Sequence, residues 1–164
     1  MGYELLAIQT AHLSLLITTA KYILSIDIMN IEDLKNILLK ENHTIVIYKN
    51  DASVHTSNDR GVAPLMKLLK EDKSQLKDAM IADKVIGKAA ALLMAYAKVK
   101  EVYTPNISAP ALKVFKNYNI EIHYDKEVER IINRKGDGLC PMETLCLNIE
   151  NPEDAFVAIN KKEL

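Results

Sequence analysis

The sequence predicts an α/β protein, specifically a three-layer α/β/α sandwich around a mixed five-stranded sheet. Two observations predict this class. Five short β-prone segments recur along the chain, separated either by a turn signal or by a helical segment with an apolar face. The first two are joined by a turn, which indicates an antiparallel hairpin, and the later ones alternate with helices, which indicates parallel crossover connections.

The hairpin is expected in the first third of the chain. Asn30 is a favourable N-cap for a helix that precedes it. Thr44–Tyr48 is rich in β-branched residues, and Ser53–Thr56 is its return strand after a turn at Asn50-Asp51. A helix with a proline in its first turn then begins at about Ala63.

Strands and helices alternate after the hairpin. Ala79–Ala82 is an apolar run typical of a buried strand, and a helix from Lys84 to about Ala97 follows it directly. Val102–Thr104 is the next strand, and Ser108 caps the next helix. Ile120–Tyr124 alternates as a half-buried edge strand does. Two further helices are predicted near the C-terminal end, beginning at Cys140-Pro141 and at Asn151-Pro152.

Residues 30–164 are predicted to form a single domain, because no repeat, low-complexity segment or linker interrupts them. Residues 1–29 are an N-terminal extension with two open interpretations: an extra helix that covers the domain, or residues upstream of a true start at Met29. Leu5 to Ala20 is too polar for a membrane-spanning helix, and it lacks the basic start of a signal peptide.

Composition excludes several classes of function. The chain has 164 residues and a net charge of −1 without a long basic run, so neither nucleic acid nor a membrane is an expected partner. Its only cysteines are Cys140 and Cys146, which do not suggest a disulfide framework in a domain of this size. We therefore expect both to be reduced, in a cytoplasmic protein.

Three motifs in a fixed order carry a resemblance to a known family. They are Arg60-Gly61-Val62-Ala63-Pro64-Leu65, then Ala82 to Leu92, then Asn133-Arg134 before Cys140-Pro141-Met142-Glu143. Together they resemble a prokaryotic domain of unknown function, DUF 1893, over about Asn30 to Leu147. The order of elements is similar to the cytidine-deaminase-like fold. The resemblance implies that fold and implies no particular reaction.

The ligands of a deaminase zinc site are missing from the positions where the fold would hold them. Such enzymes use a His or Cys, a Cys-x-x-Cys pair and a nearby Glu. The corresponding segments here are Gly61–Pro64 and Asp83–Gly87, which contain neither His nor Cys. The four histidines are scattered without ligand spacing. The sequence therefore predicts a zinc-free domain, with no metal site and no cofactor.

The start of the helix after the Ala79–Ala82 strand is the strongest candidate site. Asp83 is expected where a strand ends, at the edge at which α/β sheets bind ligands, although it also suits a helix cap. Lys84 and Lys88 are four residues apart, so they would share one helix face and bind an anion with the free helix N–H groups. Gly87 would be unfavourable inside a helix, so either a ligand or a neighbouring element is expected to approach it closely.

Further candidates lie in the loops. Ser57, Arg60 and Gly61 follow the hairpin and, by analogy with the fold, would face the same end of the sheet as Asp83. Arg134 precedes a glycine-rich turn and is able to grip a phosphate or carboxylate with two hydrogen bonds. The alternative for each arginine is an ordinary solvated surface position.

Candidate catalytic residues are Cys140, Glu143 and Asp83. A cysteine at a helix N-terminus can have a lowered pKa, and Glu143 in the same first turn would carry protons or serve as a cap. Because no histidine lies nearby in sequence, the alternative is a buried or capping cysteine.

Three functional hypotheses follow, and the sequence leaves open whether the protein is an enzyme. The first is a zinc-free, deaminase-like domain that binds a small anionic molecule, such as a nucleotide or a nucleotide derivative. The second is a Cys140-dependent enzyme or thiol sensor. The third is a non-catalytic regulatory or structural homo-oligomer, with Leu5 to Ile28 as its self-association surface.

Overall fold

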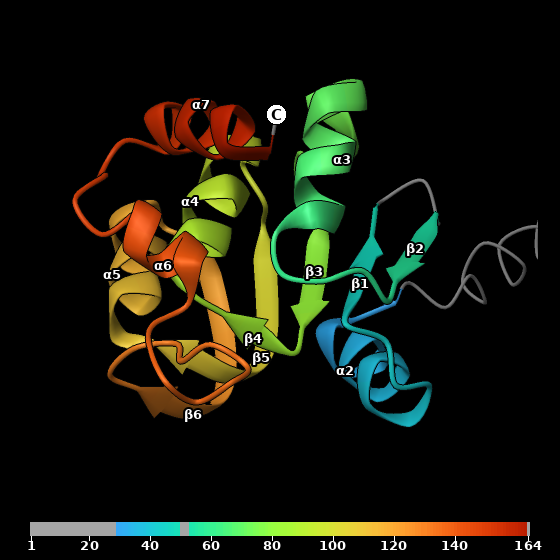
Figure 1. The fold of residues 1–164 in the computed structure, drawn as a ribbon. Helices are drawn as coiled ribbons and strands as arrows, with labels where there is room; N and C mark the ends of the chain where they lie inside the picture. Colours follow the sequence, from blue (N-terminus) through green and yellow to red (C-terminus); the bar gives the residue numbers. More distant parts are fainter. Residues whose placement is uncertain (1–28, 50–52, 164) are drawn as a thin grey trace, which may run out of the picture.

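A mixed β-sheet forms the middle of the computed structural model, which describes residues 29–49 and 53–163 (Figure 1). β1 (Ile45–Tyr48) pairs antiparallel with β2 (Val54–Ser57) on one side and with β3 (Met80–Asp83) on the other. β3 runs parallel to β5 (Glu101–Ser108), and β6 (Glu121–Val128) runs parallel to the other side of β5. The predicted mixed sheet, with its hairpin first and its crossovers later, is confirmed.

One position of the sheet is shared by two strands. β4 (Val85–Ile86) pairs with the second half of β5, and β3 pairs with the first half. Because β6 occupies the other side of β5 along its whole length, β3 and β4 lie one after the other on the same side. The sheet therefore has six strands in the five expected positions, and Lys84 marks the break between β3 and β4.

Helices cover both faces of the sheet, as the sequence predicts. α3 (Ala63–Asp72), α4 (Lys88–Ala97), α5 (Ala109–Asn117) and α7 (Pro152–Glu163) contribute to one apolar core. Of the helices that the structure describes, α2 (Ile31–Lys40) alone packs on the opposite face, through its buried leucines. A short 3₁₀ helix (Lys73–Gln75) and α6 (Pro141–Leu145) complete the elements, and α6 contacts α4 and α7.

Alternation along the strands divides the side chains between these two cores. Ile45, Ile47 and Ile81 face the larger core under α3 and α4, whereas Val46 and Ala82 face α2. Helix α4 is buried along almost its entire length between α3, α5 and α7. Its alanines allow these close approaches.

The start of α4 differs from the sequence prediction. The helix begins at Lys88 rather than at Lys84, and Gly87 is its N-cap rather than an interior residue. The cause is tertiary, because the preceding residues Val85 and Ile86 pair with β5 and extend the sheet. The expectation that Lys84 and Lys88 share a helix face is therefore wrong.

The predicted N-terminal extension, residues 1–29, lies outside the described residues except for Met29, which packs against the core under α2. Within the described part of the chain, no helix has both the length and the apolar character needed to cross a membrane.

Candidate functional site

A cavity of about 560 Å³ opens at the carboxyl end of β3. Four segments that are far apart in the sequence line it: the start of β1, the residues that lead into α3, the stretch from Asp83 to Ala90, and the stretch from Ile131 into α6. They meet because β1 runs antiparallel to β3, which places Ile45 beside Asp83. This edge of the sheet is where open α/β folds bind ligands.

Asp83 is a buried carboxyl group in this cavity, with 8% of its surface exposed. Its Oδ1 accepts a hydrogen bond from the backbone N–H of Val85 at 3.1 Å, so it holds the turn between β3 and β4 and does not cap α4. Burial raises the pKa of Asp83 to about 7, because a charged carboxylate is costly to desolvate, and the Val85 hydrogen bond offsets only part of this effect.

Glu143 is more deeply buried than Asp83, with 1% of its surface exposed. Its Oε2 accepts a hydrogen bond from the backbone N–H of Lys88 at 2.7 Å. Glu143 thus reaches from α6 to cap a different helix, α4, where a negative charge suits the helix dipole. The sequence interpretation of Glu143 as a cap had assigned it to its own helix.

The contact with Glu143 explains Gly87. A Cβ atom at this position would collide with Glu143 Oε2 and would lie 3.2 Å from Ile131 Cγ1. The close approach expected at Gly87 is therefore made by the Glu143 carboxylate. Glycine costs stability inside a helix, but Gly87 is the N-cap of α4, so this cost does not apply.

Two buried acceptors in the cavity lining lack hydrogen-bond partners. They are Glu143 Oε1 and Asn133 Oδ1. The Asn133 amide is oriented by its Nδ2, which donates to Asp137 Oδ1 at 2.8 Å. Sequence reasoning noted Asn133 only as the neighbour of Arg134, and its position ahead of the glycine-rich turn is the one signal that could have pointed to it.

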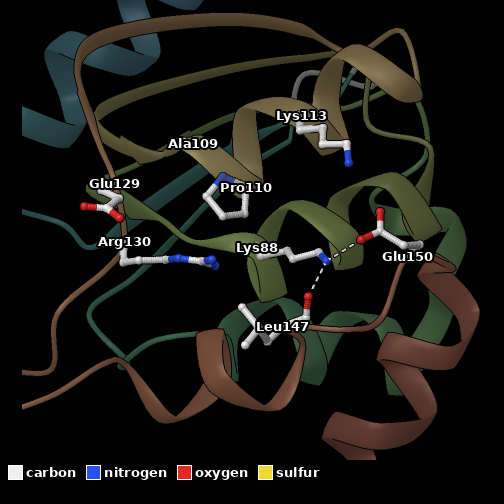
Figure 2. A pocket seen from close by; sticks show the side chains of 8 residues that line it. All are labelled: Lys88, Ala109, Pro110, Lys113, Glu129, Arg130, Leu147 and Glu150. Atoms are coloured by element: carbon white, nitrogen blue, oxygen red, sulfur yellow. Dashed lines mark hydrogen bonds and ion pairs between the residues drawn. The ribbon is translucent and has the colours of Figure 1, made fainter.

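The two lysines that were expected to act together point to different places. Lys84 lines the cavity, but its ammonium group donates to the backbone and side-chain oxygens of Asn42. Lys88 faces a second cavity of about 390 Å³, where its Nζ donates to Leu147 O at 2.8 Å and to Glu150 Oε1 at 2.7 Å (Figure 2). The structure does not bring Lys88 into the same cavity as Asp83.

Arg60, Gly61 and Arg134 all line the first cavity. Both arginine side chains are exposed, and neither guanidinium forms an ion pair or hydrogen bond with a residue that the structure describes. Ser57 is not among the lining residues. Its hydroxyl accepts from the backbone N–H of Asp59, and its carbonyl accepts from Thr44, so its role is to hold the loop after β2.

Comparison with known proteins decides the family. The profile of a domain of unknown function (DUF1893) matches residues 33–162. The chain belongs to the DUF1893 family. The crystal structure of a DUF1893 family protein from Thermotoga maritima is similar, with 29% sequence identity and a TM-score of 0.71 over 78% of this chain and 86% of that chain. The resemblance seen in the three motifs is therefore confirmed at the level of the DUF1893 family.

The likeness to deaminases is slight. A diaminohydroxyphosphoribosylaminopyrimidine deaminase/5-amino-6-(5-phosphoribosylamino)uracil reductase from Thermotoga maritima has a TM-score of 0.35 and 14% identity, over 62% of this chain and 33% of that chain. A score of this size does not place the DUF1893 chain in the deaminase superfamily. No curated protein matches the sequence.

The DUF1893 cavity does not have the ligand set of a zinc centre. Cys140 is the one cysteine among its lining residues, and the lining includes no histidine. Within the described part of the chain, one group of three possible metal ligands has its ligand atoms within 4.8 Å of one another. It consists of Glu101, Glu121 and His123, on β5 and β6. The members of that group contact one another, because His123 Nε2 is hydrogen-bonded to Glu101 Oε1 at 2.9 Å and lies 3.5 Å from Glu121 Oε1.

Cys140 and Cys146 have different surroundings, and both are free thiols. Cys140 is the N-cap of α6, is partly exposed and lines the cavity beside Glu143. Cys146 is fully buried in the larger core, and burial raises its pKa to about 11. Of the two, Cys140 is the thiol that a molecule in the cavity can reach.

Proposed function

We propose that the cavity beside Asp83 binds a small anionic molecule of the nucleotide class. The observation that carries the proposal is that Arg60 and Arg134, from loops more than half the domain apart in sequence, both line this cavity, and no described residue pairs with either guanidinium group. An arginine presents a planar fork of N–H donors that matches a phosphate or carboxylate.

Apolar side chains support the proposal because they provide a surface for the uncharged part of such a molecule. Ile45, Val85, Ile132 and Met142 belong to the lining together with two alanines of α4. A cavity of about 560 Å³ is within the range of roughly 300–1,000 Å³ that small-molecule sites occupy. An apolar wall with arginines at its exposed side suits a ring that carries a phosphate.

The test is calorimetric titration with AMP, GMP, CMP and UMP, together with thermal melts in the presence of each. We expect at least one of them to bind the wild-type protein, and the Arg60→Ala/Arg134→Ala double variant to bind it about 100-fold more weakly, because two charge-assisted contacts are lost. The double variant should fold normally, since both side chains are exposed.

Lys113→Ala/Arg130→Ala is the matched control, because it removes the same number of positive charges from the second cavity (Figure 2). This variant should retain wild-type affinity. The proposal is wrong if none of the four nucleotides binds, or if the two double variants weaken binding equally.

A further inference from the structure

Unpartnered buried acceptors are concentrated in one place. Among the described residues, the buried side-chain polar atoms without a hydrogen-bond partner are Glu143 Oε1 and Asn133 Oδ1, and both residues line the cavity beside Asp83. Burying an acceptor without a donor is unfavourable, so such atoms are rare in folded proteins and call for an explanation.

The contacts of the neighbouring atoms leave both oxygens open. Glu143 uses Oε2 to accept from the Lys88 N–H, so Oε1 is the oxygen that remains available. Asn133 uses Nδ2 to donate to Asp137, so Oδ1 is the atom that remains. An ionised carboxylate and an amide oxygen accept hydrogen bonds and cannot donate them. The complementary groups are therefore donors.

The protein's own nearby cation does not satisfy Glu143. The ammonium group of Lys88 is directed to Leu147 O and Glu150 Oε1 in the second cavity (Figure 2). Lys84 is engaged with Asn42. Neither lysine therefore donates to Glu143 Oε1, and an occupant of the cavity that Glu143 lines can supply the donor.

We infer that the ligand presents N–H donors, as an amino-substituted heterocycle or an amidine does, to Glu143 Oε1 and Asn133 Oδ1. This inference rests on the proposed function, because Arg60 and Arg134 hold the anionic end of the same molecule. The ligand is thus two-ended: an anionic group lies at the exposed arginines, and an amino or amidine group lies at the buried acceptors.

Two pairs of nucleotides test the donor end directly. GMP differs from IMP by one amino group, and CMP carries an amino group where UMP carries a carbonyl oxygen. In titrations with the wild-type protein, we expect the amino-bearing member of at least one pair to bind about tenfold more tightly or better, because the analogue leaves a buried acceptor unpaired.

Glu143→Gln is the decisive variant. The glutamine carbonyl can accept from the Lys88 N–H, which leaves an NH₂ group where the open oxygen was. The N–H donors of the ligand would then face the N–H donors of this amide. We expect the preference for the amino-bearing nucleotide to disappear. Glu150→Gln is the matched control, because it makes the same chemical change on the other partner of Lys88, outside the cavity, and it should keep the preference.

The outcomes separate the two proposals. If no nucleotide binds, both the proposed function and this inference are rejected. If binding depends on Arg60 and Arg134 but the amino group makes no difference, the inference alone fails, as it does if Glu150→Gln acts like Glu143→Gln. Should circular dichroism show that Glu143→Gln is unfolded, Asn133→Ala replaces it: a reduced preference for the amino-bearing member supports the inference, and an unchanged one overturns it.

Discussion

The two sides of the α4 N-terminus have similar charges but differ in how those charges are paired. On one side, the ammonium group of Lys88 has both a carbonyl and a carboxylate as partners, and the cavity there is lined by charges of both signs. On the other side, the Glu143 carboxylate accepts the Lys88 N–H with one oxygen and leaves the other without a partner.

This difference distinguishes a structural contact from a candidate binding contact. Lys88 has 4% of its surface exposed, and its ammonium group donates to Leu147 O and Glu150 Oε1, which joins α4 to the segment after α6. Glu143 is equally buried but only half engaged. Incomplete pairing of a buried group indicates where a ligand can gain from binding, whereas charge alone does not.

The largest effect should come from crowding the Glu143 side. Gly87→Ala would force the carboxylate away from the Lys88 N–H, because the added Cβ collides with Oε2. We expect the free energy of unfolding to fall by about 2–3 kcal/mol, from the lost charge-assisted hydrogen bond and local crowding. Urea denaturation measures this change.

The control for Gly87→Ala is Gly138→Ala, in the loop near Asn133. Its added Cβ would lie 3.5 Å from Asn133 Nδ2, which is ordinary van der Waals contact. This change should shift the free energy of unfolding by no more than about 0.5–1 kcal/mol. If Gly87→Ala is as stable as the wild type, the contact of the Glu143 carboxylate with the Lys88 N–H does not contribute to stability as expected.

A smaller change in the free energy of unfolding is expected from the titration of Asp83, which lines the same cavity as Glu143. Because the pKa of Asp83 is raised to about 7 in the folded protein and is about 3.9 in the unfolded chain, the folded state binds more protons between these values. Stability therefore falls as pH rises through this window. From pH 5.5 to pH 8 the loss attributable to Asp83 should be about 2 kcal/mol.

Asp83→Asn removes this titration and preserves the acceptor for the Val85 N–H. The difference in unfolding free energy between the wild type and Asp83→Asn, measured at pH 5, 6, 7 and 8, should therefore change with pH in the direction just given. Parallel pH profiles for the two proteins would mean that Asp83 titrates normally.

The smallest effect is expected on the paired side. Lys88→Met removes the ammonium group but leaves no buried charge behind, because 63% of the Glu150 side chain is exposed. We expect a loss of about 1 kcal/mol in unfolding free energy and no change in nucleotide affinity. If titration instead shows that Lys88→Met abolishes binding, Lys88 belongs to the anion site after all, and the division between the two sides is wrong.

The sheet could be predicted from the sequence because its signals are local. Runs of β-branched residues such as Thr44–Tyr48, the turn that follows them, and the alternation of later strands with helices all act within a few residues. Arg60 lines the same cavity as Asp83, as the analogy with the fold predicts, because strand direction determines which loops share an edge of the sheet. Ser57, which is predicted to face the same end, does not line the cavity.

The details of the site could not be predicted, because they depend on contacts between distant residues. Whether the chain after Asp83 becomes helix or strand is decided by pairing with β5, and the Lys84 N–H is taken by Thr44 O. Glu143 caps a helix 55 positions earlier in the chain, which no local capping rule describes. The Lys88 side chain points away from the first cavity because its partners, Leu147 and Glu150, lie in the segment after α6.

The break between β3 and β4 has a consequence for how readily the cavity can be filled. The Lys84 N–H still bonds to Thr44 O, just before β1, and from Val85 the chain pairs with β5. The main chain of these two segments borders the cavity and is held by the sheet. Walls of this kind keep their shape when the cavity is empty. A ligand that enters does not have to order this wall, so binding costs entropy mainly where the loops that carry Arg60 and Arg134 become fixed.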